Sequence, residues 1–173
     1  NSEQFPNRAA MRHKDLGIWK EWNWSEVCSE VQSFAIGLKD LGFKPGDKVA
    51  IIGANRPRLY WSFAAIQSIG AIPIPMYSDS VAEEMVYVLE HAGVKFAVCQ
   101  DQEQVDKVLS VQEQLPLLEK LIYDEPRGLR EYDADFILAI SDVQKRGKKA
   151  IERDRTQDVE WRMGIDKLVS DEL

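Results

Sequence analysis

Apolar and polar positions change their spacing several times along residues 25–123, from a helical period to short apolar runs. Apolar residues recur every third or fourth position over residues 27–41 and predict a helix. We expect Ser25 to cap the start of this helix and Gly42 to end it in the left-handed conformation. Residues 49–52 form a short and wholly apolar run, which is typical of a strand buried on both faces of a parallel sheet.

The same helix-then-strand order repeats along the chain. Helices are predicted over 56–69, from a capping box at Ser80 and Glu83 up to Gly93, and from Asp101 to a point before Pro116, with strands over 71–76, 94–99 and 121–123. Asn55 is the expected cap of the first of these helices. Pro73 and Pro75 lack N–H groups on the same edge of their strand, so this strand is expected to pair fully on one side only. Four such units in about 100 residues predict an α/β fold, with a parallel sheet flanked by helices on both faces.

The two ends of the chain show weaker patterns. Residues 17–24 are rich in strand-forming residues and predict a short strand or hairpin. Residues 136–140 are apolar and fit either a strand or a buried helix, and Ser141 is expected to cap a basic helical stretch behind them. Six of the residues from 145 to 155 are Lys or Arg, and we interpret them as a solvated helix face.

Composition narrows the classes of function. With 173 residues the chain fits about one domain, and its net charge of −7 argues against nucleic-acid binding. Its apolar runs fall short of the about 20 residues that cross a bilayer. Cys28 and Cys99 are interpreted as buried side chains without a disulfide, in a reducing cytoplasm. His13 and His91 are interpreted as structural, because the sequence lacks the converging ligands of a zinc site.

A sheet of this kind commonly binds nucleotides, but phosphate-binding loop patterns do not occur in the sequence. The dinucleotide pattern G-x-G-x-x-G is missing, since no two of the ten glycines lie two positions apart. Gly37 and Gly42 have the spacing of a P-loop, but Phe43 and Lys44 follow them in place of Lys and Ser or Thr. Residues 53–55 could present N–H groups to an anion, and we interpret them as an ordinary strand-to-helix turn.

Several stretches carry a family resemblance. They are 22–27 (Trp-Asn-Trp-Ser-Glu-Val), 38–42 (Leu-Lys-Asp-Leu-Gly), 44–51 (Lys-Pro-Gly-Asp-Lys-Val-Ala-Ile), 55–61 (Asn-Arg-Pro-Arg-Leu-Tyr-Trp), 65–77 (Ala-Ile-Gln-Ser-Ile-Gly-Ala-Ile-Pro-Ile-Pro-Met-Tyr) and 91–95 (His-Ala-Gly-Val-Lys). Together, in this order and at these intervals, they resemble the first part of the adenylate-forming, AMP-binding enzymes, and in particular of the long-chain fatty acyl-CoA synthetases. The resemblance covers essentially the whole chain, more loosely after Tyr123.

This resemblance implies a two-step ligase. In such enzymes a fatty acid reacts with ATP and Mg²⁺ to give an acyl-adenylate and pyrophosphate, and the thiol of coenzyme A then displaces AMP. The family's Thr-Ser-Gly-Thr-Thr-Gly loop, aromatic-Gly-x-Thr-Glu motif and Thr-Gly-Asp ribose clamp do not occur between Asn1 and Leu173. We therefore assign no catalytic, cofactor-binding or metal-binding residue in this sequence. The fragment alone is expected to be inactive and to bind neither ATP, Mg²⁺ nor coenzyme A.

The resemblance also sets the expected organisation and partners. Residues 1–173 are expected to be a truncated N-terminal part of the AMP-binding domain, with a strand or hairpin segment at 1–24, an alternating core at 25–123 and a loosely ordered connection at 124–173. The expected partners are a fatty acid, coenzyme A and the remaining lobes of the same chain, without nucleic acid. The expected location is the cytoplasm, while peripheral contact with the inner membrane face and homo-oligomer formation stay open. Two alternatives remain: a stand-alone, non-catalytic α/β binding or interaction module, and a fatty acyl-AMP ligase.

Overall fold

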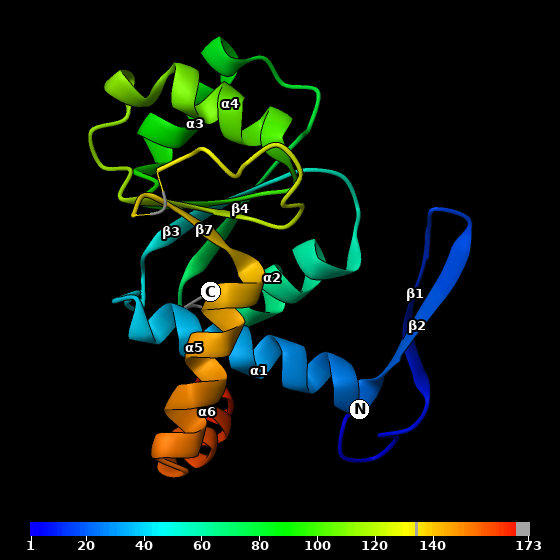
Figure 1. The fold of residues 1–173 in the computed structure, drawn as a ribbon. Helices are drawn as coiled ribbons and strands as arrows, with labels where there is room; N and C mark the ends of the chain where they lie inside the picture. Colours follow the sequence, from blue (N-terminus) through cyan, green and yellow to red (C-terminus); the bar gives the residue numbers. More distant parts are fainter. Residues whose placement is uncertain (134, 169–173) are drawn as a thin grey trace.

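The computed structural model describes residues 1–133 and 135–168 and has an α/β architecture (Figure 1). Its elements in chain order are β1 (Ala9–Asp15), β2 (Ile18–Asn23), α1 (Trp24–Asp40), β3 (Lys48–Ile52), α2 (Pro57–Ser68), β4 (Ile72–Met76), α3 (Ala82–Ala92), β5 (Phe96–Cys99), α4 (Gln102–Ser110), the 3₁₀ turn η1 (Gln112–Gln114), β6 (Lys120–Tyr123), β7 (Ile137–Ala139), α5 (Ile140–Arg153) and α6 (Thr156–Lys167). A five-stranded parallel sheet has the order β4-β3-β5-β6-β7, and β1 pairs with β2 in a separate antiparallel hairpin.

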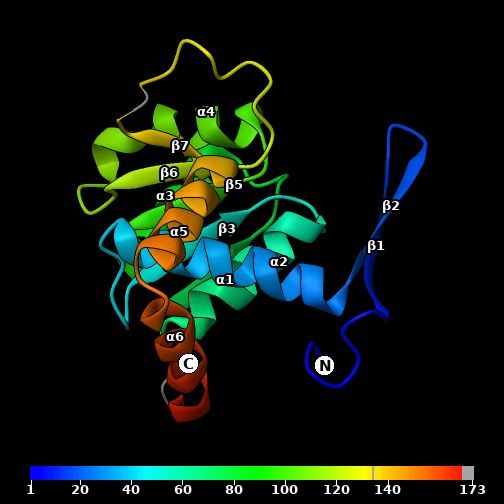
Figure 2. The ribbon, with the colours of Figure 1, turned by 60° about the horizontal axis from the view of Figure 1, so that its bottom comes forward.

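Helices cover both faces of the parallel sheet (Figures 1 and 2). The helices α1, α2 and α5 pack on the face to which Val49 and Ile51 of β3 contribute. The helices α3 and α4 pack on the opposite face, to which Ala50 and Ile52 contribute. Because successive side chains of a strand point to opposite faces, a strand between two helical layers is apolar at every position. The expected fold class, a parallel sheet with helices on both faces, is confirmed.

The strand β4 forms one edge of the sheet. It pairs with β3, with Pro73 opposite Val49 and Pro75 opposite Ile51. Proline cannot donate a ladder hydrogen bond, so strands that contain it occupy sheet edges. The expectation that this strand pairs on one side is confirmed.

The start of α1 differs from the prediction. Its N-cap is Asn23 rather than Ser25, so the helix begins earlier than expected. The Asn23 Oδ1 accepts a hydrogen bond from the Glu26 N–H at 2.9 Å, and the Glu26 carboxylate accepts one from the Asn23 N–H at 2.8 Å. This reciprocal capping box satisfies two backbone donors, whereas a single serine cap satisfies one. The prediction at Ser25 was wrong because a better cap lies two residues before it.

Two further caps were also predicted wrongly. The N-cap of α2 is Arg56 rather than Asn55, and the N-cap of α3 is Val81. Neither cap residue makes a side-chain capping bond, so the expected box between Ser80 and Glu83 does not form. Proline at the start of α2 has no N–H that needs an acceptor, so this helix can begin without a side-chain cap.

Three other predicted helix boundaries are confirmed. Gly42, with a φ of 94°, and Gly93, with a φ of 66°, follow α1 and α3 in the left-handed region. The Asp101 carboxylate caps α4 by accepting a hydrogen bond from the Gln104 N–H at 3.3 Å.

Residues 136–140 contain both of the structures that the sequence allowed. The strand β7 ends at Ala139, and α5 begins at Ile140 without an intervening loop. Ser141 therefore lies inside α5, and the prediction that it caps this helix was wrong. Within the expected connection at 124–173, the described residues contain β7, α5 and α6. The division of the chain at residues 24 and 123 stays a prediction.

The helices α1 and α5 cross in close contact through two glycines. A Cβ placed on Gly147 would overlap the carbonyl oxygen of Ser33 and lie 2.8 Å from its carbonyl carbon. A Cβ placed on Gly37 would likewise overlap the carbonyl oxygen of Val143 and lie 2.8 Å from its carbonyl carbon. Gly37 is therefore needed for helix packing, which explains its presence without a P-loop.

The hairpin of β1 and β2 extends away from the sheet and its helices (Figures 1 and 2). The predicted strand or hairpin at 17–24 is thus confirmed, and β1 is the partner strand that the sequence did not indicate. No helix in residues 1–133 and 135–168 has the length and apolar character needed to cross a membrane.

Candidate functional site

The parallel sheet has a topological switch point between β3 and β5. The strand that follows β3 in the chain, β4, lies on one side of β3, and β5 lies on the other. In open α/β sheets, ligands bind outside the carboxyl ends of the strands at such a point. Here Gly53 follows β3 and Gln100 follows β5. A Cβ added at Gly53 would lie 2.6 Å from the Cβ of Gln100 and 2.8 Å from Cδ2 of Leu59, so the turn packs directly against both side chains.

The side chain of Gln100 fills the switch point. Gln100 is 7% exposed, its Oε1 accepts a hydrogen bond from the Ala54 N–H at 2.6 Å, and its Nε2 donates to the Asp101 carboxylate at 2.9 Å. A turn that binds phosphate needs free N–H groups and room for the anion. The Ala54 N–H is bonded within the chain instead, which supports the interpretation of residues 53–55 as an ordinary strand-to-helix turn.

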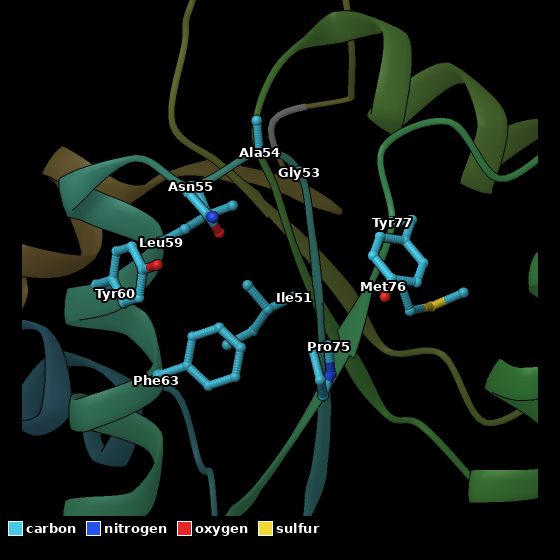
Figure 3. Close-up of a pocket in the computed structure, with 10 residues that line it drawn as sticks. All are labelled: Ile51, Gly53, Ala54, Asn55, Leu59, Tyr60, Phe63, Pro75, Met76 and Tyr77. Atoms are coloured by element: carbon cyan, nitrogen blue, oxygen red, sulfur yellow. The ribbon is translucent and has the colours of Figure 1, made fainter. Parts of the chain in front are cut away.

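A pocket of about 240 Å³ lies beside the switch point, between α2 and the carboxyl end of β4 (Figure 3). It is lined by Ile51, Gly53, Ala54, Asn55, Leu59, Tyr60, Phe63, Pro75, Met76 and Tyr77. Among these described residues no side chain carries a charge, so the pocket suits an apolar or aromatic group better than a phosphate. The polar side-chain groups available to a ligand are the amide of Asn55 and the hydroxyls of Tyr60 and Tyr77.

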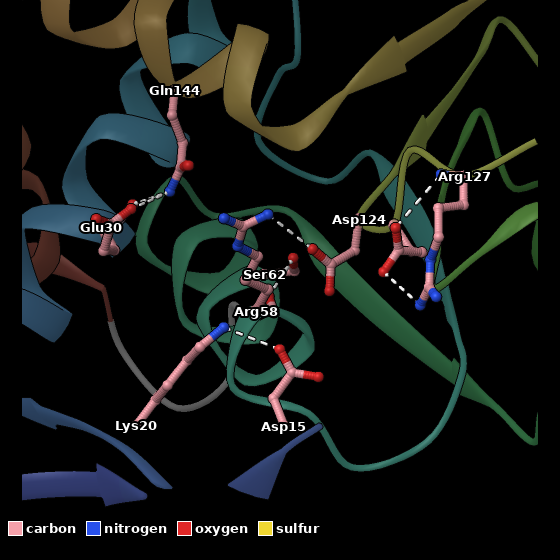
Figure 4. Close-up of polar contacts among 9 residues, drawn as sticks. Asp15, Lys20, Glu30, Arg58, Ser62, Asp124, Arg127 and Gln144 are labelled. Atoms are coloured by element: carbon pink, nitrogen blue, oxygen red, sulfur yellow. Dashed lines mark hydrogen bonds and ion pairs between the residues drawn. The ribbon is translucent and has the colours of Figure 1, made fainter. Parts of the chain in front are cut away.

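A second pocket, of about 250 Å³, lies between the hairpin, the start of α2 and the segment after β6. Four of its charged groups form two pairs: Arg58 donates to Asp124 at 2.9 Å, and Lys20 donates to Asp15 at 2.8 Å (Figure 4). The other two, Arg56 and Glu125, carry opposite charges. The hydrogen bond and the charge of Lys20 lower the pKa of the Asp15 carboxyl, so this group stays ionised. Because these charges are matched within the chain, the pocket offers little net charge to a ligand.

The histidines and cysteines of the sequence analysis lie in separate places. His13 lines the polar pocket, whereas His91 stacks on Tyr87 in α3 with the ring centroids 5.6 Å apart. Cys99 is fully buried, and burial raises the pKa of its thiol to about 12, so it remains protonated. Its interpretation as a buried side chain is confirmed, while Cys28 is half-buried and both cysteines are free.

The residues at this edge of the sheet do not fit Mg·ATP. The Gln100 Oε1 already accepts the hydrogen bond of the Ala54 N–H, and no cationic side chain lines the neighbouring pocket. Across residues 1–133 and 135–168, no group of three His, Cys, Asp or Glu side chains could hold a metal ion. Sequence reasoning missed the role of Gln100, because its partner Ala54 is 46 residues away and no local pattern marks the pair.

Two relatives show how far the similarity to curated proteins extends. The uncharacterized protein Rv1549 of Mycobacterium tuberculosis is 35% identical over 85 residues, which are 49% of this chain and 48% of that protein. Long chain acyl-CoA synthetase 8 of Arabidopsis thaliana is 28% identical over 141 residues, which cover 78% of this chain and 19% of the synthetase. The chain thus spans about half the length of the first relative and about a fifth of the second.

The fold of the chain also occurs in a solved structure, and its sequence matches a family model. The crystal structure of coronafacic acid ligase from Pectobacterium brasiliense aligns with a TM-score of 0.72, covering 83% of this chain and 27% of the ligase. At 17% sequence identity, this similarity shows a shared fold alone. The family model described as AMP-binding enzyme matches residues 1–158 and confirms the resemblance to the adenylate-forming enzymes. The chain therefore belongs to the AMP-binding enzyme family.

Proposed function

We propose that the chain is the N-terminal part of the AMP-binding domain of a long-chain-fatty-acid–CoA ligase and that it is inactive by itself. The match of residues 1–158 to the AMP-binding enzyme family carries this proposal. The long-chain acyl-CoA synthetase that aligns with 78% of the chain supports the choice of a fatty-acid substrate. In the proposal, the complete ligase uses ATP, Mg²⁺ and coenzyme A to convert a fatty acid to acyl-CoA, with release of AMP and pyrophosphate.

In this proposal the residues of the chain act as a scaffold. Gln100 holds the turn after β3 closed through its bond to the Ala54 N–H, so the reacting groups would be bound by parts of a longer chain. We place the protein in the cytoplasm, with peripheral contact to the membrane that holds its fatty-acid substrates.

The test is ATP–pyrophosphate exchange with palmitate, run beside a complete long-chain acyl-CoA ligase as the positive control. We expect no exchange above the rate without protein, while cooperative urea unfolding shows that the chain is folded. Exchange above that background, abolished by omitting palmitate, would refute the proposal of inactivity. The reading frame of the gene supplies a second test, because several hundred further codons in frame support the ligase.

A stand-alone, non-catalytic module is the second candidate. It is favoured by the mycobacterial relative, since the 85 aligned residues form 48% of that protein, which is therefore itself short. A stop codon directly after Leu173, together with no exchange activity, would support the module over the ligase. A fatty acyl-AMP ligase would instead be indicated if a longer form produces acyl-adenylate without transfer to coenzyme A.

A further inference from the structure

The tip of the β1–β2 hairpin, residues 16–19, carries three large apolar side chains in solvent. Leu16 is 87% exposed, Ile18 is 68% exposed and Trp19 is 67% exposed. The hairpin extends away from the sheet (Figures 1 and 2). The exposed fractions of the three side chains show that the described residues leave them largely uncovered. Ile18 and Trp19 are successive strand residues and point to opposite faces of the hairpin, so exposed apolar surface lies on both faces of its tip. Large exposed apolar side chains gathered in one place mark an interaction site, because their exposure to water is unfavourable.

The backbone at the tip supports a functional reason for this exposure. Leu16 has a φ of 47° and Gly17 a φ of 83°, so both residues of the two-residue turn lie in the left-handed region. Such turns favour Asn, Asp and Gly, whereas a leucine there is strained. Neither local conformation nor burial explains the leucine. An apolar side chain at this exposed turn position is explained if it enters an apolar environment outside this chain.

The charged residues of the hairpin indicate what kind of apolar environment its tip enters. Residues 9–23, which form the hairpin, contain three basic side chains of Lys or Arg and two acidic ones, so the hairpin has a net charge of +1 in a chain of net charge −7. The two carboxylates are neutralised by Arg12 and Lys20 within the hairpin. The ammonium of Lys14 instead lies 5.9 Å from the centre of the Trp19 ring. A convex tip with aliphatic groups, one tryptophan and a lysine beside it matches the interface of an anionic bilayer, where aromatic rings sit at headgroup depth and lysine contacts the lipid charges.

We propose that the hairpin tip inserts Leu16, Ile18 and Trp19 into the interfacial layer of an anionic membrane, with Lys14 at the headgroups. The inference deepens the proposed function and rests on it for its biological setting, since a ligase for fatty acids meets its substrates at membranes. It names a surface for the peripheral contact that the sequence left open.

The test measures binding of the chain to vesicles of phosphatidylcholine, with and without phosphatidylglycerol. We expect co-sedimentation with the anionic vesicles and a blue shift of tryptophan fluorescence that Trp19→Phe removes. The double variant Ile18→Ser/Trp19→Ser should lower the partition coefficient by at least about tenfold, since it removes most of the inserted apolar surface. Lys14→Glu should lower the partition coefficient by about fivefold or more, and only on anionic vesicles.

The matched control replaces two apolar side chains of α6 that are about half exposed. Val159 and Met163 are 55% and 54% exposed, and Val159→Ser/Met163→Ser should bind vesicles as the wild type does. All variants should keep the urea midpoint of the wild type, because the replaced side chains lie in solvent. Absence of vesicle binding, or equal binding by the tip and control variants, would overturn the proposal and favour a protein partner for the tip. The assay contains no ATP, fatty acid or coenzyme A, so its result is independent of the exchange test.

Discussion

The substitution Gly147→Ala tests whether the α1–α5 crossing depends on its two glycines. The added Cβ would overlap the carbonyl oxygen of Ser33 and lie 2.8 Å from its carbonyl carbon. Non-bonded carbon atoms prefer separations of about 3.5 to 4.0 Å, so the two helices must move apart by roughly 1 Å. The obstructing atoms belong to the backbone of α1, and a side-chain rotation cannot relieve the overlap.

The magnitude follows from two opposing contributions. Overpacking a close contact costs about 1–3 kcal/mol, and more where backbone must move, as it must here. Alanine regains about 1 kcal/mol of helix propensity relative to glycine. Separating the helices also loosens the packing of Phe34 and Val143, which are 1% exposed at this crossing. We therefore expect a net loss of about 2 kcal/mol in the free energy of unfolding, which lowers the Tm by roughly 4–8 °C for a chain of this size.

The assay is urea and thermal unfolding followed by circular dichroism, with Gly164→Ala as the matched control. Gly164 lies in the neighbouring helix α6, and a Cβ there would meet nothing within 4 Å. The control should therefore raise the unfolding free energy by up to about 1 kcal/mol through helix propensity alone. If Gly147→Ala proves as stable as Gly164→Ala, the close helix crossing does not exist as described.

Two further variants test the turns at opposite ends of β3. Gln100→Ala removes the acceptor of the Ala54 N–H and leaves a cavity at the switch point, so its free energy of unfolding in urea should fall by about 1–3 kcal/mol. The control Gln67→Ala replaces an exposed glutamine and should change this free energy little. Burial alone raises the pKa of the Asp47 carboxyl, but the hydrogen bond from Lys95 at 2.8 Å and a backbone N–H outweigh it and lower the pKa. The stabilisation from a lowered carboxyl pKa is present above the unfolded pKa and is lost as the pH falls through the folded pKa. Asp47→Asn should therefore be less stable than the wild type at pH 7, and this difference should shrink on acidification below about pH 4; an undiminished difference at pH 2 would contradict the assignment.

The candidate site was the part of the molecule that the sequence described least well. The pattern identified the turn at 53–55 and its two possible roles, but the choice between them depended on Gln100, which follows another strand, β5. The apolar pocket beside it combines residues of β3, α2 and β4, and no spacing within any one of these elements marks them as a group. Local spacing cannot reveal a site whose members become neighbours only when parallel strands are placed side by side.

The amino-acid sequence by itself determined the alternation of helices and strands, because periodicity and wholly apolar runs reflect local geometry and burial. It also determined the edge position of β4, since Pro73 and Pro75 remove ladder donors whatever the rest of the chain does. Only the tertiary structure decided that Gly37 serves a helix crossing, that Gln100 closes the switch point, and that the β1–β2 hairpin extends with an exposed apolar tip. Each of these depends on atoms far apart in the chain, whose separation is fixed by packing of whole elements and not by the residues next to them.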